Sequence, residues 1–238
     1  MKNLIIAATS AFILSGTAYA ADLAPIIDPA PAAYDWTGIH IGAHVGYGWS
    51  SNDWTRIQNA SGTEFGPGGE DSHDADGFLG GIQAGYTHQF NQFVLGVEGD
   101  ISWTGMDGID TWDAGGGGGY RDVTADYNWV GTLAVRGGIA FDRTLLYLKA
   151  GGAVASVEYG HTGNNNNFAS TDTRTGWLVG AGAEHAFTEK WSVKAEYNYI
   201  DFGTEAIAME NVGAGPSPAI YSVNSKAHIL NVGLNFRF

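Results

Sequence analysis

Hydrophobic and polar residues alternate strictly over the last eleven residues of the sequence, 228–238. One side of an extended strand would carry Leu230, Val232, Leu234, Phe236 and Phe238, and the other side would carry Asn231, Gly233, Asn235 and Arg237. Successive strand side chains point to opposite faces, so one face of this segment is apolar and the other polar. The pattern is typical of a strand with lipid on one side and a polar lumen on the other. Taken alone, the segment also fits the edge strand of a soluble sheet.

Seven earlier segments carry the same alternation and predict further strands, at 36–50, 78–90, 93–103, 127–140, 145–159, 175–187 and 191–202. Three connections are short (91–92, 142–144 and 188–190), and four are long (51–76, 104–126, 160–174 and 203–227). Trp36 at one end of the first segment, with Tyr47 and Trp49 at the other, suggests two aromatic girdles. Together these features predict an all-β fold. It is an eight-stranded antiparallel up-and-down transmembrane barrel with short periplasmic turns, four long external loops and both termini in the periplasm.

The N-terminus has the pattern of a secretory signal peptide. Lys2 supplies a positive charge, residues 4–14 are apolar but too few to span a bilayer, and Ala18-Tyr19-Ala20 forms a small-x-small cleavage site. We therefore expect a signal peptide at 1–20, a proline-rich periplasmic lead-in at 21–35 and the barrel domain at 36–238. No later stretch approaches the ~20 apolar residues of a spanning helix, so insertion into a membrane requires a closed barrel.

Composition excludes several classes of function. The chain has no cysteine, which removes disulfides, thiolate metal sites and cysteine nucleophiles. A formal net charge of -14 argues against nucleic acid as a partner, because no basic patch is present to neutralise phosphates. The mean hydropathy of -0.10 does not conflict with membrane insertion, since alternating strands hide their apolar residues from window averages.

Charged residues within the strands share the inward parity. They are Glu98, Asp100, Arg136, Lys149, Glu184, Lys194, Glu196 and Arg237. Counting from the short turns places them in the lower half of one lumen, where acids and bases of nearly equal number can pair. Eight strands enclose a space about wide enough for side chains to fill. A structural plug is therefore favoured over an ion path, and conductance measurements separate the two.

Several segments also resemble a known family. They are ADLAP at 21–25, DWTGIHIG at 35–42, NWVGTLAVRGGIAFD at 128–142, YLKAGGAVA at 147–155, the stretch at 179–203 and NVGLNFRF at 231–238. They are similar to the small outer-membrane proteins of alphaproteobacteria, a group that includes RopB-like porin-family proteins and haemin-binding surface antigens and shares the barrel of the OmpA transmembrane domain. The resemblance spans nearly the whole predicted mature chain and is weakest in the loops. We expect no peptidoglycan-binding domain after the barrel, so the wall-anchoring role of full-length OmpA proteins is not expected.

The resemblance implies an abundant outer-membrane protein that supports envelope integrity and surface display. The alternatives are a narrow porin for small solutes, or a haemin-binding or adhesion receptor acting through the loops. Expected partners are outer-membrane lipid and lipopolysaccharide, together with the barrel assembly machinery, which reads a closing Phe238. A monomer without a cofactor is expected.

The predicted loops contain candidate ligands for haem iron and for metal ions. Haem iron would need a presented ligand, for which His73 and His161 are the loop histidines clear of strand ends, yet acidic loops would repel haem propionates. Acidic clusters in the first two loops lack the spacing of an EF-hand, so solvated loops are favoured over a metal site. Nor is an enzyme expected, because His228 near the outer rim has no evident partner beyond Ser222 and Ser225.

Overall fold

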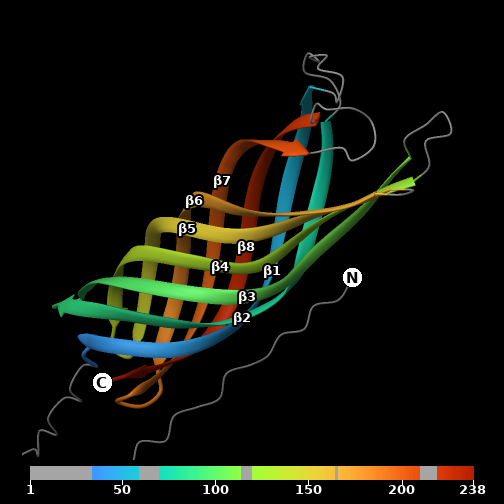
Figure 1. The fold of residues 1–238 in the computed structure, drawn as a ribbon. Helices are drawn as coiled ribbons and strands as arrows, with labels where there is room; N and C mark the ends of the chain where they lie inside the picture. Colours follow the sequence, from blue (N-terminus) through green and yellow to red (C-terminus); the bar gives the residue numbers. More distant parts are fainter. Residues whose placement is uncertain (1–33, 59–69, 114–119, 164–165, 210–218) are drawn as a thin grey trace, which may run out of the picture. The chain divides into compact units, whose positions relative to one another are not determined.

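The computed structural model describes residues 34–58, 70–113, 120–163, 166–209 and 219–238. The strands are β1 (Gly38–Gln58), β2 (Glu70–Phe90), β3 (Phe93–Asp113), β4 (Tyr120–Phe141), β5 (Thr144–Gly163), β6 (Asn166–Ala186), β7 (Trp191–Met209) and β8 (Ala219–Arg237). Each strand pairs antiparallel with its sequence neighbours, and β8 pairs with β1 to close the barrel (Figure 1). The predicted eight-stranded antiparallel barrel is confirmed. The predicted signal peptide and lead-in lie almost entirely outside the described residues and stay predictions.

Three tight turns connect β2 to β3, β4 to β5 and β6 to β7. Asn91 and Asp142 each open a turn with positive φ, 55° and 52°, a conformation that Asn and Asp adopt at low cost. Positive φ at the first turn position suits a two-residue hairpin, because it matches the right-handed twist of the strands. We call the end of the barrel that carries these turns, where β1 also begins and β8 ends, the turn end. The opposite end is the loop end.

The strands are longer than their hydrophobic pattern predicts. They contain 19 to 22 residues. The prediction of loops at 51–76, 104–126, 160–174 and 203–227 was therefore wrong in extent, because the strands continue into each of these segments. Pairing continues through polar positions, for example between Asp107 and Asp126 and between Asp53 and Ser72. Backbone hydrogen bonds form the ladder whatever the side chain is, so the apolar alternation marks only the lipid-contacting part of each strand.

The barrel wall divides near the loop end. Pairing between β2 and β3 extends to Asp76 and Asp107, and pairing between β6 and β7 extends to Trp177 and Asp201, whereas the other strand pairs continue further. Strands β3 to β6 therefore extend as one sheet and β7, β8, β1 and β2 as another, which diverge in Figure 1. Only the part of the structure toward the turn end is a fully closed barrel.

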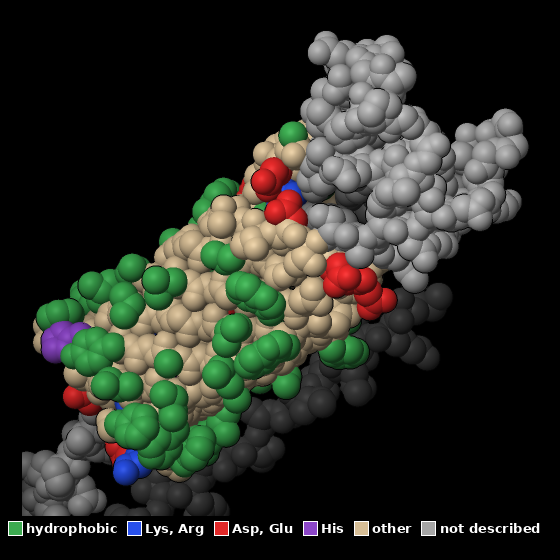
Figure 2. Space-filling model, viewed as in Figure 1, with side chains coloured by type: hydrophobic (Ala, Val, Ile, Leu, Met, Phe, Trp, Pro, Cys, Tyr) green, Lys and Arg blue, Asp and Glu red, His purple; other side chains and the backbone are tan. Residues whose placement is uncertain are grey.

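The outer wall of the closed part is apolar. Val45, Phe78, Leu133 and Leu148 are all more than two-thirds exposed, at 69%, 78%, 69% and 68%, and hydrophobic side chains are spread over this part of the wall in Figure 2. Exposed apolar groups of this number are costly in water and favourable in lipid. Among the described residues, none forms a helix that could span a membrane.

Candidate functional site: the filled lumen

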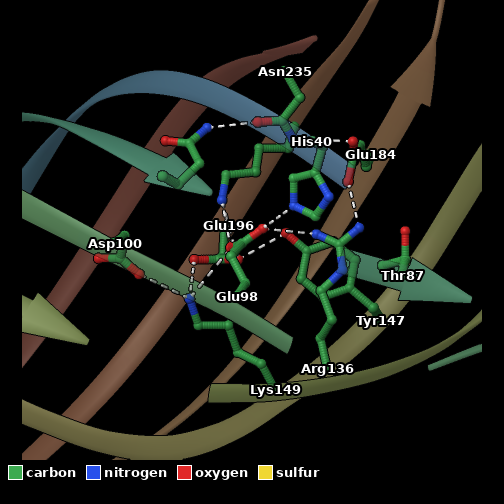
Figure 3. Close-up of polar contacts among 12 residues, drawn as sticks. His40, Thr87, Glu98, Asp100, Arg136, Tyr147, Lys149, Glu184, Glu196 and Asn235 are labelled. Carbon is green, nitrogen blue, oxygen red and sulfur yellow. Dashed lines mark hydrogen bonds and ion pairs between the residues drawn. The ribbon is translucent and has the colours of Figure 1, made fainter. Parts of the chain in front are cut away.

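Inward-facing side chains fill the barrel in layers. From the turn end these are an apolar cap, a charged layer, an apolar layer and the buried side chain of Arg174. The cap comprises Tyr34, Trp36, Val94, Leu145, Tyr147 and Ala186. The apolar layer comprises Ala75, Leu79, Met106, Tyr127, Val130, Ala134, Ala153, Ala155, Val157, Leu178, Ile200, Phe202, Val223, Ala227 and Ile229. The charged residues predicted from parity lie between these two layers, and Figure 3 shows Glu98, Arg136, Lys149, Glu184 and Glu196 converging there.

Glu98 of β3 lies at the centre of the charged layer and is 1% exposed. It accepts hydrogen bonds from Arg136 Nη1 at 2.9 Å and from Lys194 Nζ at 2.8 Å. His40 Nε2 is 3.0 Å away, and Lys149 Nζ is 3.8 Å away. A buried carboxylate loses its hydration, and this loss is offset only when several donors replace the water. Glu98 has such donors from strands on opposite sides of the barrel.

Two further buried glutamates extend the charged layer. Glu184 of β6 accepts hydrogen bonds from Arg136 Nη2 at 2.8 Å, from Ser192 Oγ at 2.6 Å and from Asn235 Nδ2 at 3.0 Å. Arg136 thereby joins Glu98 and Glu184 through its two terminal nitrogens, the forked geometry at which a guanidinium is effective.

Glu196 of β7 completes the set of buried acids. It accepts from Lys149 Nζ at 2.9 Å, from Tyr147 Oη at 2.7 Å and from Asn198 Nδ2 at 2.8 Å. Asp100, whose side chain is 14% exposed, lies at the edge of the layer, 3.6 Å from Lys149 Nζ, and accepts a hydrogen bond from Thr132. The layer thus joins side chains from strands all round the barrel.

Histidines of β1 complete this network. His44 Nδ1 lies 2.6 Å from Gln83 Oε1 and its Nε2 lies 2.8 Å from Ser102 Oγ, so the ring bridges β2 and β3. Glycines in β2 give the rings room, because a Cβ on Gly85 would lie 2.7 Å from His40 Cε1 and one on Gly81 would lie 2.8 Å from His44 Cε1. His40 and His44 of β1 therefore lie opposite glycines of β2 because only glycine leaves room for their rings.

Arg237 links the charged layer to the cap. Its Nη1 donates to the carbonyl oxygen of Trp36 at 2.6 Å and lies 2.7 Å from Thr87 Oγ1, while its guanidinium lies 5.2 Å above the Trp36 ring. Trp36 is fully buried, so its prediction as an interfacial girdle residue in the first strand was wrong. The strand begins at Gly38, and the preceding residues close the mouth of the barrel. The sequence does not reveal this inward turn, because the alternation of hydrophobic and polar residues continues through it without a break.

The apolar layer is the feature that sequence reasoning missed. Leu79, Met106 and Leu178 point inward and are at most 4% exposed, although a polar interior was expected. The signal was present, because Leu79 has the parity of Gln83 and Leu178 has the parity of Glu184. In a barrel this narrow, apolar side chains pack against one another across the lumen as they would in a soluble core.

Arg174 of β6 lies inside the barrel at the level where β6 and β7 separate. It is 1% exposed, and its Nη2 donates to the carbonyl oxygens of Val223 at 3.1 Å and Gly203 at 3.4 Å. Its Nε lies 3.4 Å from Glu205. These contacts connect β6 to β7 and β8 above the last β6–β7 backbone pair.

The other candidate residues are placed elsewhere. The backbones of His73 and His161 lie in β2 and β5 rather than in loops, which corrects the prediction, and their side chains are outside the described part of the chain. Phe238 is 71% exposed at the turn end and its backbone nitrogen donates to Ile39 at 3.0 Å. Among the described residues, no group of three or more acids or histidines is placed to hold a metal ion.

His228 has partners that the sequence did not reveal. It faces outward on β8, its Nδ1 lies 2.6 Å from Tyr197 Oη, and its ring stacks on Trp49 with centroids 5.5 Å apart. Ser225, proposed as a neighbour, is buried on the inward face instead.

A closed antiparallel barrel with an apolar wall, aromatic residues near both edges and a polar network inside defines an integral membrane protein of the outer-membrane barrel class. Residues 8–238 match the family model described as the outer membrane protein beta-barrel domain. The chain belongs to this family and is an outer-membrane β-barrel protein.

Relatives and solved structures agree with this assignment. The chain is 32% identical over 256 residues to the 31 kDa outer-membrane immunogenic protein of Brucella melitensis, covering 100% of both chains. It is 28% identical to a 22 kDa outer membrane protein of Rhizobium leguminosarum, covering 87% of this chain and 82% of the relative. The outer membrane protein OprG of Pseudomonas aeruginosa has the same fold, with a TM-score of 0.57, 13% identity and coverage of 87% and 98%. The predicted resemblance to alphaproteobacterial outer-membrane barrels is confirmed.

Proposed function

We propose that this protein is a non-conducting and non-catalytic structural barrel that stabilises the outer membrane and displays its loop end on the cell surface. The observation that carries the proposal is the filling of the lumen. The cap, the charged layer and the apolar layer lie in series, and their side chains are buried against one another. A water-filled path would need continuous polar surface, whereas the apolar layer offers none and the charges below it are already paired.

We further propose that the turn end faces the periplasm and the loop end faces the exterior, with outer-membrane lipid as the principal partner. The tight turns at one end, and the strands that continue beyond the closed part of the barrel at the other, support this orientation. The chain has no cysteine, so single cysteines at Gln92 and Asp74 can report it. A membrane-impermeant maleimide should label Asp74→Cys on intact cells and Gln92→Cys only after the outer membrane is permeabilised. Labelling of Gln92→Cys on intact cells would reverse the orientation.

Planar-bilayer recording of the refolded protein tests the non-conducting role. Folding is first checked by the heat-dependent change in electrophoretic mobility that folded barrels show. We expect no regular conductance steps from the native protein or from Asp100→Asn, which changes the least buried acid of the layer. Regular steps that change in size or ion selectivity with Asp100→Asn would replace this proposal with the narrow porin.

A further inference from the structure

We propose that the outer wall carries a binding site for the phosphate group of an outer-leaflet glycolipid, formed by Lys226 and His228 of β8 on a frame of aromatic residues. This inference rests on the orientation in the proposed function, because it places the loop end at the outer leaflet. It adds a specific polar lipid contact at the loop-end border of the apolar part of the wall.

The frame is a set of rings around His228. Trp49 of β1 and Tyr199 of β7 are its cross-strand partners, and the Tyr199 ring centroid lies 5.2 Å from that of His228. Trp177 of β6 packs edge-on against Tyr199 at 5.6 Å. Aromatic residues of this kind mark the boundary between hydrocarbon and headgroups.

The orientation of His228 leaves one nitrogen for a ligand. Tyr197 Oη lies 2.6 Å from Nδ1, and when the phenol donates this hydrogen bond the neutral ring carries its proton on Nε2. The protonated imidazolium also has a proton there. With the phenol as the donor, the site presents an N–H donor in both the neutral and the protonated form, and Tyr197 together with stacking on Trp49 fixes its direction.

Lys226 supplies the charge. It is the next outward residue of β8 toward the loop end, and Ser51 and Asp201 are its cross-strand partners. Asp201 is bonded locally, because its carboxylate accepts from the backbone nitrogen of Gly203 at 2.8 Å and lies 3.4 Å from Tyr199 Oη. Lys226 forms no ion pair with any residue that the structure describes. An ammonium at the headgroup level beside an N–H donor is suited to a phosphate oxygen.

The charges on the rest of the wall favour phosphate binding at Lys226 and His228 rather than elsewhere. On the rung that contains His228 and Trp49, strands β2 to β5 carry Asp76, Asp107, Asp126 and Glu158 as successive cross-strand partners. Acidic side chains are visible near the loop end of the face in Figure 2. Among outward strand side chains that the structure describes, Lys226 is the only lysine or arginine. Anionic lipid is thus repelled from β2 to β5 and attracted to β8.

Native mass spectrometry of the refolded protein with added lipid tests the site. The probes are bisphosphorylated lipid A, the same glycolipid without phosphate, and phosphatidylglycerol. We expect retention of one lipid A. The double variant Lys226→Gln/His228→Gln should bind it about tenfold more weakly. The matched control is Lys190→Gln, which removes one exposed lysine at the turn end.

Three outcomes would overturn the site: unchanged retention by the double variant, equal retention of the phosphate-free glycolipid, or equal retention of phosphatidylglycerol. The measurement is made on purified protein and is independent of orientation in cells. Failure of the maleimide experiment and failure of this one are therefore distinguishable.

Discussion

Arg136 and Glu98 form the central ion pair of the barrel, with 2.9 Å between Nη1 and Oε2 and both side chains at most 1% exposed. The same guanidinium reaches Glu184, so a single side chain of β4 holds two acids from different strands. Removing one member of such a group leaves a buried charge without a partner. The resulting loss of folding free energy is far larger than the stability that the intact pair provides compared with well-packed apolar residues.

Arg136→Ala should therefore destabilise the folded barrel by about 3–5 kcal/mol, measured as urea unfolding in lipid vesicles. The control is Arg143→Ala, which breaks the ion pair of Arg143 with Glu189 at a turn, where the side chains are 36% and 75% exposed. An exposed pair contributes little, and the control should lose less than ~1 kcal/mol. Equal losses for the two variants would show that the charged layer is not a cooperative network.

The alternation that predicted the barrel explains which parts of it could be derived from sequence. Lipid imposes a period of two on outward positions such as Leu230 and Val232, so strand identity and parity follow directly, and with parity the inward position of Glu98 and Arg136. Pairing between particular charges depends on register around the closed barrel. Glu98 and Lys194 lie on strands that are not neighbours, and their contact at 2.8 Å cannot be read from either segment.

Burial of Trp36 was also beyond the sequence pattern, and it gives a second prediction. Trp36→Ala should lower the free energy of unfolding by about 3–5 kcal/mol, because a large ring is removed from a closed apolar cap and Arg237 loses the aromatic face that it covers. Trp103→Ala removes the same ring from the outer wall, where it is 55% exposed, and should cost less. A larger loss at Trp103 would indicate that the cap does not contribute to stability.

Two glycines of β2 give a prediction about space within the lumen. Gly85→Ala would place a Cβ 2.6 Å from the carbonyl oxygen of Val97 and 2.7 Å from His40 Cε1, so the His40–Glu98 contact must shift. We expect a loss of about 1–3 kcal/mol in the same unfolding assay. Gly80→Ala on the same strand meets its nearest atom, the carbonyl oxygen of His44, at 3.7 Å and should be nearly neutral. If both variants unfold at the same urea concentration, the lumen is less tightly packed than the structure shows.

Arg174 leads to the last prediction, which concerns the level at which the wall divides. Its guanidinium donates to Gly203 and Val223 above the final β6–β7 backbone pair, so it limits separation of the two sheets from within. In Arg174→Met the chain retains a long apolar side chain but loses these charged hydrogen bonds, each worth about 1.5–3 kcal/mol when buried. Backbone amide hydrogen exchange should then accelerate by at least about tenfold in the parts of β6, β7 and β8 nearest the loop end, while the exchange rates of amides at the closed turn end are unchanged.

Thr173→Ala, which alters the adjacent exposed residue, serves as the control. Acceleration that extends to the turn end would mean that Arg174 stabilises the whole barrel, and no acceleration would mean that backbone pairing alone sets where the wall divides.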